Sequence, residues 1–282
     1  MARSEKNLTA VFTDTANAIR SKTGTTETIC PLDFADKINS IETGGGTGGG
    51  MKAYFEAGGK CGRSSITSFN DVIQYSDTEN VKSFTYFFEY CEDLVTLPNI
   101  DVSNGDDFRF MFTYCRKIKN LPDLNINSGS KSMQYMFNYC EALETLPMID
   151  TSNTYTLEKL CGYCKSLKTI PELNLTGVQK LDGAFYNCKS LQSIPHINAS
   201  SIDSFRDTFY GCKSISSFKM YNIKYDLNLS ASNMFTRESL VEILNNLSTV
   251  TSTKTLTLGS TNLAKLTDAD KAIATNKGWT LA

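Results

Sequence analysis

Apolar positions recur at a constant phase through the middle of this chain. The segment YMFNYCEALETLP, from Tyr135 to Pro147, returns at nearly equal intervals. Its cysteine recurs in steps of 24, 25, 24, 24 and 24 residues, at Cys91, Cys115, Cys140, Cys164, Cys188 and Cys212. A period in this range is typical of stacked units that are each too small to bury their own apolar face. The pattern therefore predicts a solenoid.

Three columns of the repeat keep an apolar residue in nearly every unit. The aromatic column reads Phe88, Phe112, Phe137, Cys161, Phe185, Phe209 and Phe235. Two aliphatic columns follow, one at Leu94, Ile118, Leu143, Leu167, Leu191 and Ile215 and one at Leu97, Leu121, Leu146, Ile170, Ile194 and Phe218. Such columns must point inward, because each residue lies on its equivalent in the next coil. We expect each coil to contain a short helical turn that ends at the cysteine, followed by a short extended segment.

The N-terminal part predicts a separate small unit. Residues 1–43 show apolar positions near helical spacing in two short segments. The side chains expected to attach this unit to a partner are Leu8, Phe12, Ile19, Phe34 and Ile38. Residues 44–50, GGGTGGG, are not followed by the lysine of a phosphate-binding loop and predict a flexible linker. The unit is therefore expected to be tethered to the solenoid and not packed on it.

The solenoid is expected over residues 51–236, with 51–80 as an atypical N-terminal cap, because an end unit must present one face to water. After Phe235 the repeat stops. Arg237–Leu247 has helical spacing and Thr253–Leu258 alternates like a strand. Thr267 has the features of a helix N-cap, and Gly278 those of a C-terminal stop. Residues 237–282 are therefore expected to form an α/β C-terminal cap.

Composition and charge argue against several classes of partner. The chain has 28 basic and 30 acidic residues and a formal net charge of −2, so no strong attraction to nucleic acid is expected. No apolar run approaches the length of a bilayer span, which argues against membrane insertion. The N-terminus, MARSEK, lacks the features of a secretory signal peptide, so export through such a signal is not expected.

The nine cysteines admit two interpretations. Coils stacked at about 4.8 Å would bring column cysteines within the Cα range of disulfides, about 4.4 to 6.8 Å. Buried free thiols are the interpretation we favour, because free cysteine commonly packs as a small apolar side chain and no export signal is evident. The CxxC spacing of Cys161 and Cys164 is interpreted as core packing, because Cys161 occupies the aromatic column and no second CxxC exists.

Two columns that flank the cysteine are candidates for partner contact. The position after each cysteine carries charge, and its basic members are Arg116, Lys165, Lys189 and Lys213. They form either an edge for an anionic polymer or a solvated turn without a partner, and the second is the simpler interpretation. The position before the cysteine holds Tyr90, Tyr114, Tyr139 and Tyr163. These form either an exposed ladder suited to carbohydrate or protein contact, or packed rings with only their hydroxyls exposed.

Catalytic and metal-binding patterns are not evident. The one histidine, His196, follows a repeat proline at a variable position and is interpreted as a surface residue. The sequence contains no nucleophile elbow, no HExxH and no calcium-loop pattern. We therefore expect no catalytic residues, no metal, no cofactor and no enzymatic activity.

The repeat units resemble a known family. The pattern Met-Phe-x-x-Cys-x-x-Leu-x-x-(Leu/Ile)-Pro, followed in one unit by Ile149-Asp150-Thr151-Ser152-Asn153, is similar to the BspA-like leucine-rich repeats of bacterial surface proteins and phage proteins. The resemblance covers about residues 70–236 and implies an α/β fold, a leucine-rich-repeat solenoid of about six to seven coils of about 24 residues, used for adhesion without catalysis. The departures are Cys161 in the aromatic column and the missing proline and cysteine of the last coil.

A second resemblance concerns the N-terminal unit. The stretches 15–24, TANAIRSKTG, and 29–38, ICPLDFADKI, look like the head of tail-associated proteins of phages of Gram-positive bacteria. This implies attachment to other virion proteins, assembly in the host cytoplasm, and a homo-oligomer in the particle. The first hypothesis is therefore a virion structural protein whose solenoid binds a host cell-surface polymer or protein. A decoration or spacer without a ligand, and a bacterial protein-interaction repeat protein, are the alternatives.

Overall fold

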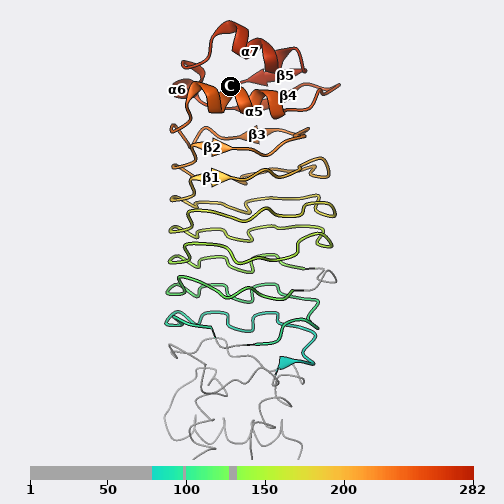
Figure 1. Ribbon diagram of the computed structural model, residues 1–282, viewed down its shortest axis with the longest axis vertical. Helices are drawn as coiled ribbons and strands as arrows, with labels where there is room; N and C mark the ends of the chain where they lie inside the picture. The colour runs from blue at the N-terminus through green and yellow to red at the C-terminus, as the bar shows by residue number, and fades with distance from the viewer. Residues whose placement is uncertain (1–77, 98–99, 127–131) are drawn as a thin grey trace, which may run out of the picture.

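The computed structural model describes residues 78–97, 100–126 and 132–282. The predicted attachment unit with its five apolar side chains, the glycine-rich linker and most of the expected N-terminal cap lie outside the described residues. The described chain forms a column of stacked coils that ends in a group of short helices and strands (Figure 1).

Successive coils lie in parallel register one repeat apart. Ser83 bridges Asp107, and Asp107 bridges Ser132, at separations of 24 and 25 residues. Thr156 bridges Lys180, which bridges Ser204 in the next coil. Regular strands are short: β1 (Ser193–Ile194) pairs in parallel with β2 (Ser217–Phe218). The assignment of these coils to the leucine-rich-repeat class stays a prediction.

The prediction of a helical turn before each cysteine is wrong. Within the described coils this segment consists of consecutive tight turns in which the N–H groups alternate between two kinds of acceptor. The N–H of Phe112 donates to the Met136 carbonyl of the next coil at 2.8 Å, whereas the N–H of Thr113 donates to Phe110, three residues back, at 3.1 Å. Phe110 and Tyr114 have positive φ angles of 59° and 64°, which an α-helix does not accommodate.

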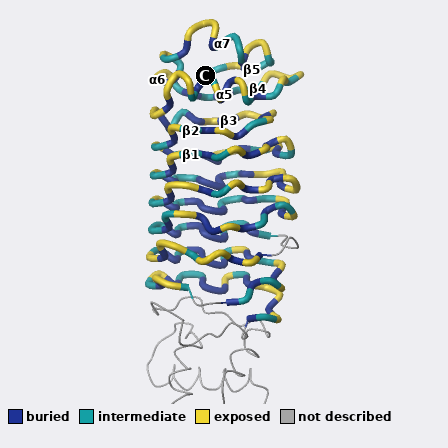
Figure 2. Tube along the Cα trace, in the orientation of Figure 1, coloured by how far each residue is buried: buried dark blue, intermediate teal, exposed yellow. Residues whose placement is uncertain are grey.

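The core is a continuous column inside the coils (Figure 2). Every described member of the predicted aromatic column is buried, and Phe88, Phe112 and Phe137 stack at centroid distances of 5.5 and 5.6 Å. The prediction for the two aliphatic columns is confirmed except at Leu97 and Leu121, which are only partly buried. Burying each large apolar side chain stabilises the fold by roughly 1.5–3 kcal/mol. Summed over many coils, this stabilisation holds together a fold that has few helices and strands.

The residues after the repeats form the predicted helices and strands and one further short helix, α6 (Ser260–Leu263), that the pattern does not predict. Helix α5 (Arg237–Asn246) buries Leu240, Ile243 and Leu244, and β4 (Lys254–Thr257) follows it. Helix α6 leads to α7 (Asp268–Thr275), with Thr267 as its N-cap, and β5 (Trp279–Leu281) follows α7. Strand β4 pairs in parallel with β5 on one side and with β3 (Leu227–Asn228) of the last coil on the other. This pairing joins the terminal segment to the coil stack.

Candidate ligand-binding surface

The four predicted tyrosines form one stacked series, called here the tyrosine ladder: Tyr90, Tyr114, Tyr139 and Tyr163. Their ring centroids are 4.5, 4.4 and 4.2 Å apart and the rings lie within 10° of parallel. All four side chains are half-buried. Each of the two interpretations of these tyrosines therefore holds in part: the rings pack on one another, and each residue remains partly exposed. Burial and the hydroxyl of Tyr163 raise the pKa of Tyr139 to about 12.

A second aromatic series lies four residues before the ladder. Phe110 stacks between Tyr86 and Tyr135, with both centroid distances at 4.8 Å. The next coil places Lys159 at this position, and its ammonium lies 3.6 Å from the centroid of the Tyr186 ring. This series was not among the predicted columns, although the sequence carries a signal for it: an aromatic residue lies four positions before each of the first three ladder tyrosines.

The charged column after the cysteines, called here the charged edge, comprises Glu92, Arg116, Glu141, Lys165, Lys189 and Lys213. Arg116 lies between two carboxylates, 3.3 Å from Glu92 and 2.7 Å from Glu141. Lys165 binds the other oxygen of Glu141 at 2.6 Å. The Arg116 guanidinium also lies 5.2 Å from the Tyr114 ring centroid, so the edge and the ladder form one surface. Neither Lys189 nor Lys213 has an ion-pair partner among the described residues.

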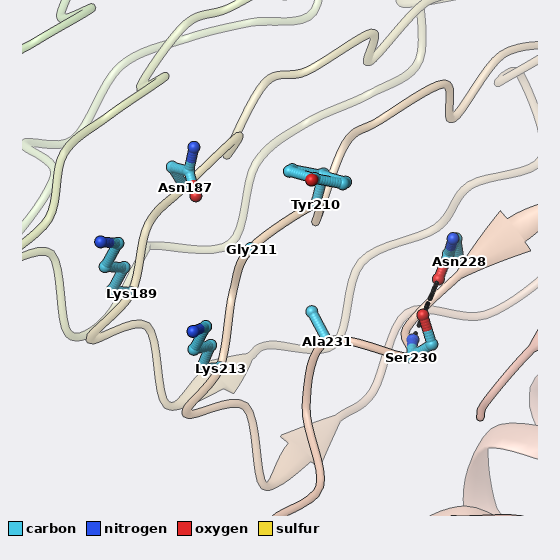
Figure 3. A pocket seen from close by; sticks show the side chains of 8 residues that line it. All are labelled: Asn187, Lys189, Tyr210, Gly211, Lys213, Asn228, Ser230 and Ala231. Atoms are coloured by element: carbon cyan, nitrogen blue, oxygen red, sulfur yellow. Dashed lines mark hydrogen bonds between the residues drawn. The ribbon is translucent and has the colours of Figure 1, made fainter. Parts of the chain in front are cut away.

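A hollow of about 410 Å³ opens where the ladder ends (Figure 3). Its lining comes from three successive coils and consists of Asn187, Lys189, Tyr210, Gly211, Lys213, Asn228, Ser230 and Ala231. Asn187 and Gly211 occupy the ladder column, so the rings of the earlier coils have no counterpart there. Tyr210 is 54% exposed and stacks on Tyr186 at 4.9 Å. The predicted surface residues Lys189 and Lys213 thus line one site, together with six residues that were not among the predicted surface residues.

The repeat cysteines belong to the core and not to this surface. All seven cysteines of the described ranges are free and buried: Cys91, Cys115, Cys140, Cys161, Cys164, Cys188 and Cys212. The Sγ of Cys140 donates to the Phe112 carbonyl of the preceding coil at 3.1 Å, and burial raises its pKa well above the usual range. The interpretation of the CxxC pair as core packing is confirmed, because Cys161 and Cys164 are fully buried.

The remaining chemistry-bearing candidates lie apart from the hollow. His196 is exposed and stacks on Tyr221 at 4.4 Å, as a surface residue. Within the described ranges, no group of three His, Cys, Asp or Glu side chains could hold a metal ion. No helix in that same part of the chain is long and apolar enough to cross a membrane.

Comparison with known proteins yields one family. The model of the family described as "Mycoplasma protein of unknown function, DUF285" matches residues 64–149 and again 131–246. These two overlapping matches cover more than half of the 282 residues. The chain belongs to the DUF285 family. No curated protein and no solved structure matches the chain.

DUF285 membership agrees with the BspA-like character of the repeats. Both matches fall on the repeat region, and their union, residues 64–246, includes the tyrosine ladder, the charged edge and the hollow. The match begins at residue 64. Residues 15–38, which resemble phage tail-associated proteins, therefore lie outside it. The family description assigns no activity to DUF285 proteins.

Proposed function

We propose that this DUF285 protein is a virion structural protein, of a phage or a phage-tail-like particle, that presents its coil stack for adhesion to a host cell surface. The observation that carries the adhesion half is the tyrosine ladder beside the charged edge. Four rings at stacking distance give a rigid aromatic strip along several coils, and such strips suit contact with sugar rings or extended polymers. The N-terminal resemblance supports the virion half of the proposal.

The rigidity of the strip follows from the backbone. Each ladder tyrosine has a positive φ, between 59° and 64°, and donates or accepts within the coil-to-coil hydrogen bonds of the turn. The Tyr114 N–H, for example, donates to the Asn138 carbonyl at 2.9 Å. A surface whose side chains are already ordered loses little conformational entropy on binding, which favours affinity. No catalytic role is assigned to any residue of this surface.

The adhesion half is tested by sedimentation of the full-length chain with isolated Gram-positive cell walls. We expect the wild type to pellet with the walls, and the double variant Tyr114→Asn, Tyr139→Asn to lose about tenfold in affinity. Asparagine is the matched replacement, because Asn187 occupies the same column with a φ of 57°. The control pair Tyr155→Asn, Tyr225→Asn removes exposed rings away from the ladder and should bind as the wild type does. A wild type that stays in the supernatant refutes adhesion.

The virion half needs a separate experiment. Mass spectrometry and immunogold electron microscopy of purified particles should find the chain in the particle at repeated, symmetric positions. A chain deleted of residues 1–50 should be absent from particles while its coils remain folded. Normal incorporation of the deleted chain would contradict attachment through Leu8, Phe12, Ile19, Phe34 and Ile38.

One observation favours the spacer alternative. Ion pairs between neighbouring coils neutralise much of the surface: Lys117 pairs with Asp93 and Lys168 with Glu144, each at 2.6 Å, in addition to the pairs of Glu141. An evenly neutralised surface is what a decoration without a ligand requires. The same sedimentation experiment separates the two functions, because a spacer would be found in particles and would not bind walls.

A further inference from the structure

The hollow at the end of the tyrosine ladder arises from a change in one column. Tyr163 is the last ladder ring, and the next two coils place Asn187 and Gly211 at that position. Gly211 has a φ of 74°, and a Cβ there would overlap the amide oxygen of Asn187. The column carries a ring in the four earlier coils and no ring at Asn187 or Gly211, so the space that a ring would fill stays open. Its volume, about 410 Å³, suits one or two sugar units.

The charge of the edge changes at the same coils. From Glu92 to Lys165 the column alternates in sign, and each cation has a carboxylate partner on a neighbouring coil. Lys189 and Lys213 break this alternation, and both are exposed without an ion-pair partner among the described residues. Two ammonium groups on adjacent coils repel each other unless an anion lies between or beside them. The hollow therefore carries an uncompensated positive charge that the rest of the edge does not.

The other polar groups in the lining are available for hydrogen bonds. The Oδ1 of Asn228 accepts from the N–H and the hydroxyl of Ser230 at 3.0 and 2.7 Å, which leaves its amide nitrogen as a donor. The side chain of Asn187 has no hydrogen-bond partner within the described chain. No carboxylate is among the eight lining residues. Such a donor-rich site favours a ligand with several oxygen acceptors and a negative charge.

An aromatic ring completes the site. Tyr186 supports one face of Tyr210 at 4.9 Å, so the ring is held in place although it is 54% exposed. In Figure 3 the Tyr210 ring lies between Asn187 and Asn228, and Lys189 and Lys213 lie on the same side as Asn187. A fixed, exposed aromatic face beside hydrogen-bond donors is suited to the apolar face of a sugar ring.

We propose that this hollow binds an anionic saccharide unit of a surface polymer. Lys189 and Lys213 would hold its phosphodiester or carboxylate, Asn187 and Asn228 would donate to its hydroxyl oxygens, and the sugar would pack on Tyr210. This inference rests on the proposed adhesive function, for which it names the ligand class and the coils that select it. The tyrosine ladder would then carry the adjoining units of the same polymer.

The test is calorimetric titration of the full-length chain with four defined probes at low ionic strength. They are a glucosylated polyglycerol phosphate, polyglycerol phosphate without sugar, oligogalacturonate and neutral dextran oligosaccharides. We expect the two charged saccharides to bind more tightly than dextran, and their affinity to fall with added salt. The phosphate and the carboxylate probes decide which anion is preferred. Equal binding of dextran would overturn the role of the lysines, and equal binding of sugar-free polyglycerol phosphate would overturn the role of Tyr210.

Two sets of variants assign the binding to the hollow. Lys189→Gln with Lys213→Gln should weaken charged-saccharide binding about tenfold or more and remove most of its salt dependence. The matched pair Lys219→Gln, Lys224→Gln makes the same charge change at exposed lysines outside the lining and should bind as the wild type does. Tyr210→Ala should weaken binding about fivefold, whereas Tyr155→Ala, at a comparable exposure of 51%, should not. Thermal melting checks that every variant is folded.

The outcomes separate this inference from the proposed function. If walls bind the wild type and lose affinity for the ladder variant, but the hollow variants bind charged saccharides unchanged, the hollow is not the site and adhesion stands. If the wild type binds charged saccharides through the hollow but does not sediment with walls, the site stands and the adhesive function fails. A control lysine pair that weakens binding as much as the hollow pair would reduce the effect to net charge and refute the site.

Discussion

At the scale of single residues, the turn before each cysteine has two positions with positive φ angles, four residues apart. The first position is occupied in successive coils by Tyr86, Phe110, Tyr135, Lys159, Gly183 and Asp207. The second, four residues later, is the position of the tyrosine ladder. The tyrosine column is visible in the sequence, but the backbone conformation is not, because tyrosine in the left-handed region is uncommon. Only Gly183, Asn187, Asp207 and Gly211, in the later coils, carry a residue type that indicates it.

Asp207 tests this conformation, because its φ is 56° and its side chain is exposed. We expect Asp207→Gly to be more stable than Asp207→Ala by about 1 kcal/mol, since a Cβ is strained in the left-handed region and glycine is not. Chemical denaturation of the two variants gives the difference. Gly183 already occupies this position one coil earlier, so the substitution is compatible with the stack.

The control is Asp203, an exposed residue of the same coil that is not among the positive-φ positions. There alanine should be more stable than glycine, because glycine raises the entropy of the unfolded chain without relieving strain. The same order at both positions would show that the left-handed backbone at Asp207 carries no strain.

The buried thiols predict a loss of stability at alkaline pH. Burial, and to a lesser extent neighbouring thiols, raise the pKa of Cys115, Cys140, Cys161 and Cys188 well above 9.0, and burial raises that of Cys212 to about 12. Below pH 9 both states keep these protons, so the full stability is present. Above pH 9 the unfolded chain releases them and the folded chain does not, so the free energy of unfolding should fall by about 1.4 kcal/mol per thiol per pH unit.

Denaturant titrations between pH 8 and 10.5 measure this slope, and Cys140→Ala should reduce it by about 1.4 kcal/mol per pH unit. Leu143→Ala is the matched control, because it also truncates a fully buried side chain of that coil but removes no ionisable group. Its stability should be lower at every pH with the slope unchanged. A slope that Cys140→Ala leaves intact would mean that this thiol ionises equally in both states.

At the scale of elements, helix α7 shows what local sequence predicts and what it does not. Thr267 forms a capping box with Asp270: its hydroxyl accepts from the Asp270 N–H, and the Asp270 carboxylate accepts from the Thr267 N–H at 2.8 Å. That cap is readable from a threonine followed three residues later by an acid. The second partner of Asp270 is Arg237, at 2.7 and 2.8 Å. Arg237 opens α5, 33 residues earlier, and no local pattern joins the two helices.

The contacts of Asp270 with Arg237 and Thr267 predict a pH-dependent contribution to stability. The hydrogen bonds from Arg237, and then from Thr267, lower the pKa of Asp270 from 3.8 to about 2. The stabilisation is therefore present above about pH 4 and is lost as the pH falls toward 2. We expect Asp270→Asn to be less stable than the wild type at pH 7 and to approach it at pH 2. Thermal melting across this range checks the convergence, and a constant gap would contradict it.

The cap itself is tested by Thr267→Ala. Loss of the N-cap hydroxyl should cost about 1 kcal/mol of unfolding free energy. Thr251→Ala is the control, because Thr251 is exposed in the loop before β4 and has no hydrogen bond in the structure's described part. Equal loss in both variants would assign the effect to threonine in general and not to the cap.

At the scale of the whole molecule, the sequence predicts what repeats and misses what changes from coil to coil. The period and the inward columns follow from identical residues that meet their own equivalents, so Phe137 and Leu143 are read correctly. The hollow has no such signature: it requires the absence of a ring at Asn187 and Gly211, a ring one residue earlier at Tyr210, and a wall from Asn228 to Ala231 in an irregular coil. Those features combine only when three coils are stacked.

The end of the stack yields the last prediction. Strand β3 of the last coil pairs with β4. Just after β3, the Leu229 N–H donates to the Thr257 carbonyl of β4 at 2.8 Å. Helix α5 lies against β2 and buries Leu240, Ile243 and Leu244. A chain that ends at residue 236 would therefore expose both an apolar face and an unpaired strand edge, which favour association between copies.

We expect this truncated chain to form larger oligomers or aggregates than the full-length protein, measured by size-exclusion chromatography with light scattering at several concentrations. The matched control is full-length Arg237→Ala, which weakens the contact with Asp270 but leaves β4 over β3, and should elute as the wild type does. We expect association at this end because each coil is covered by a neighbour on both sides. In the full-length chain, residues 237–282 cover the outer side of the last coil. A truncated chain that elutes like the full-length protein, with unchanged melting, would show that the final coil is self-sufficient.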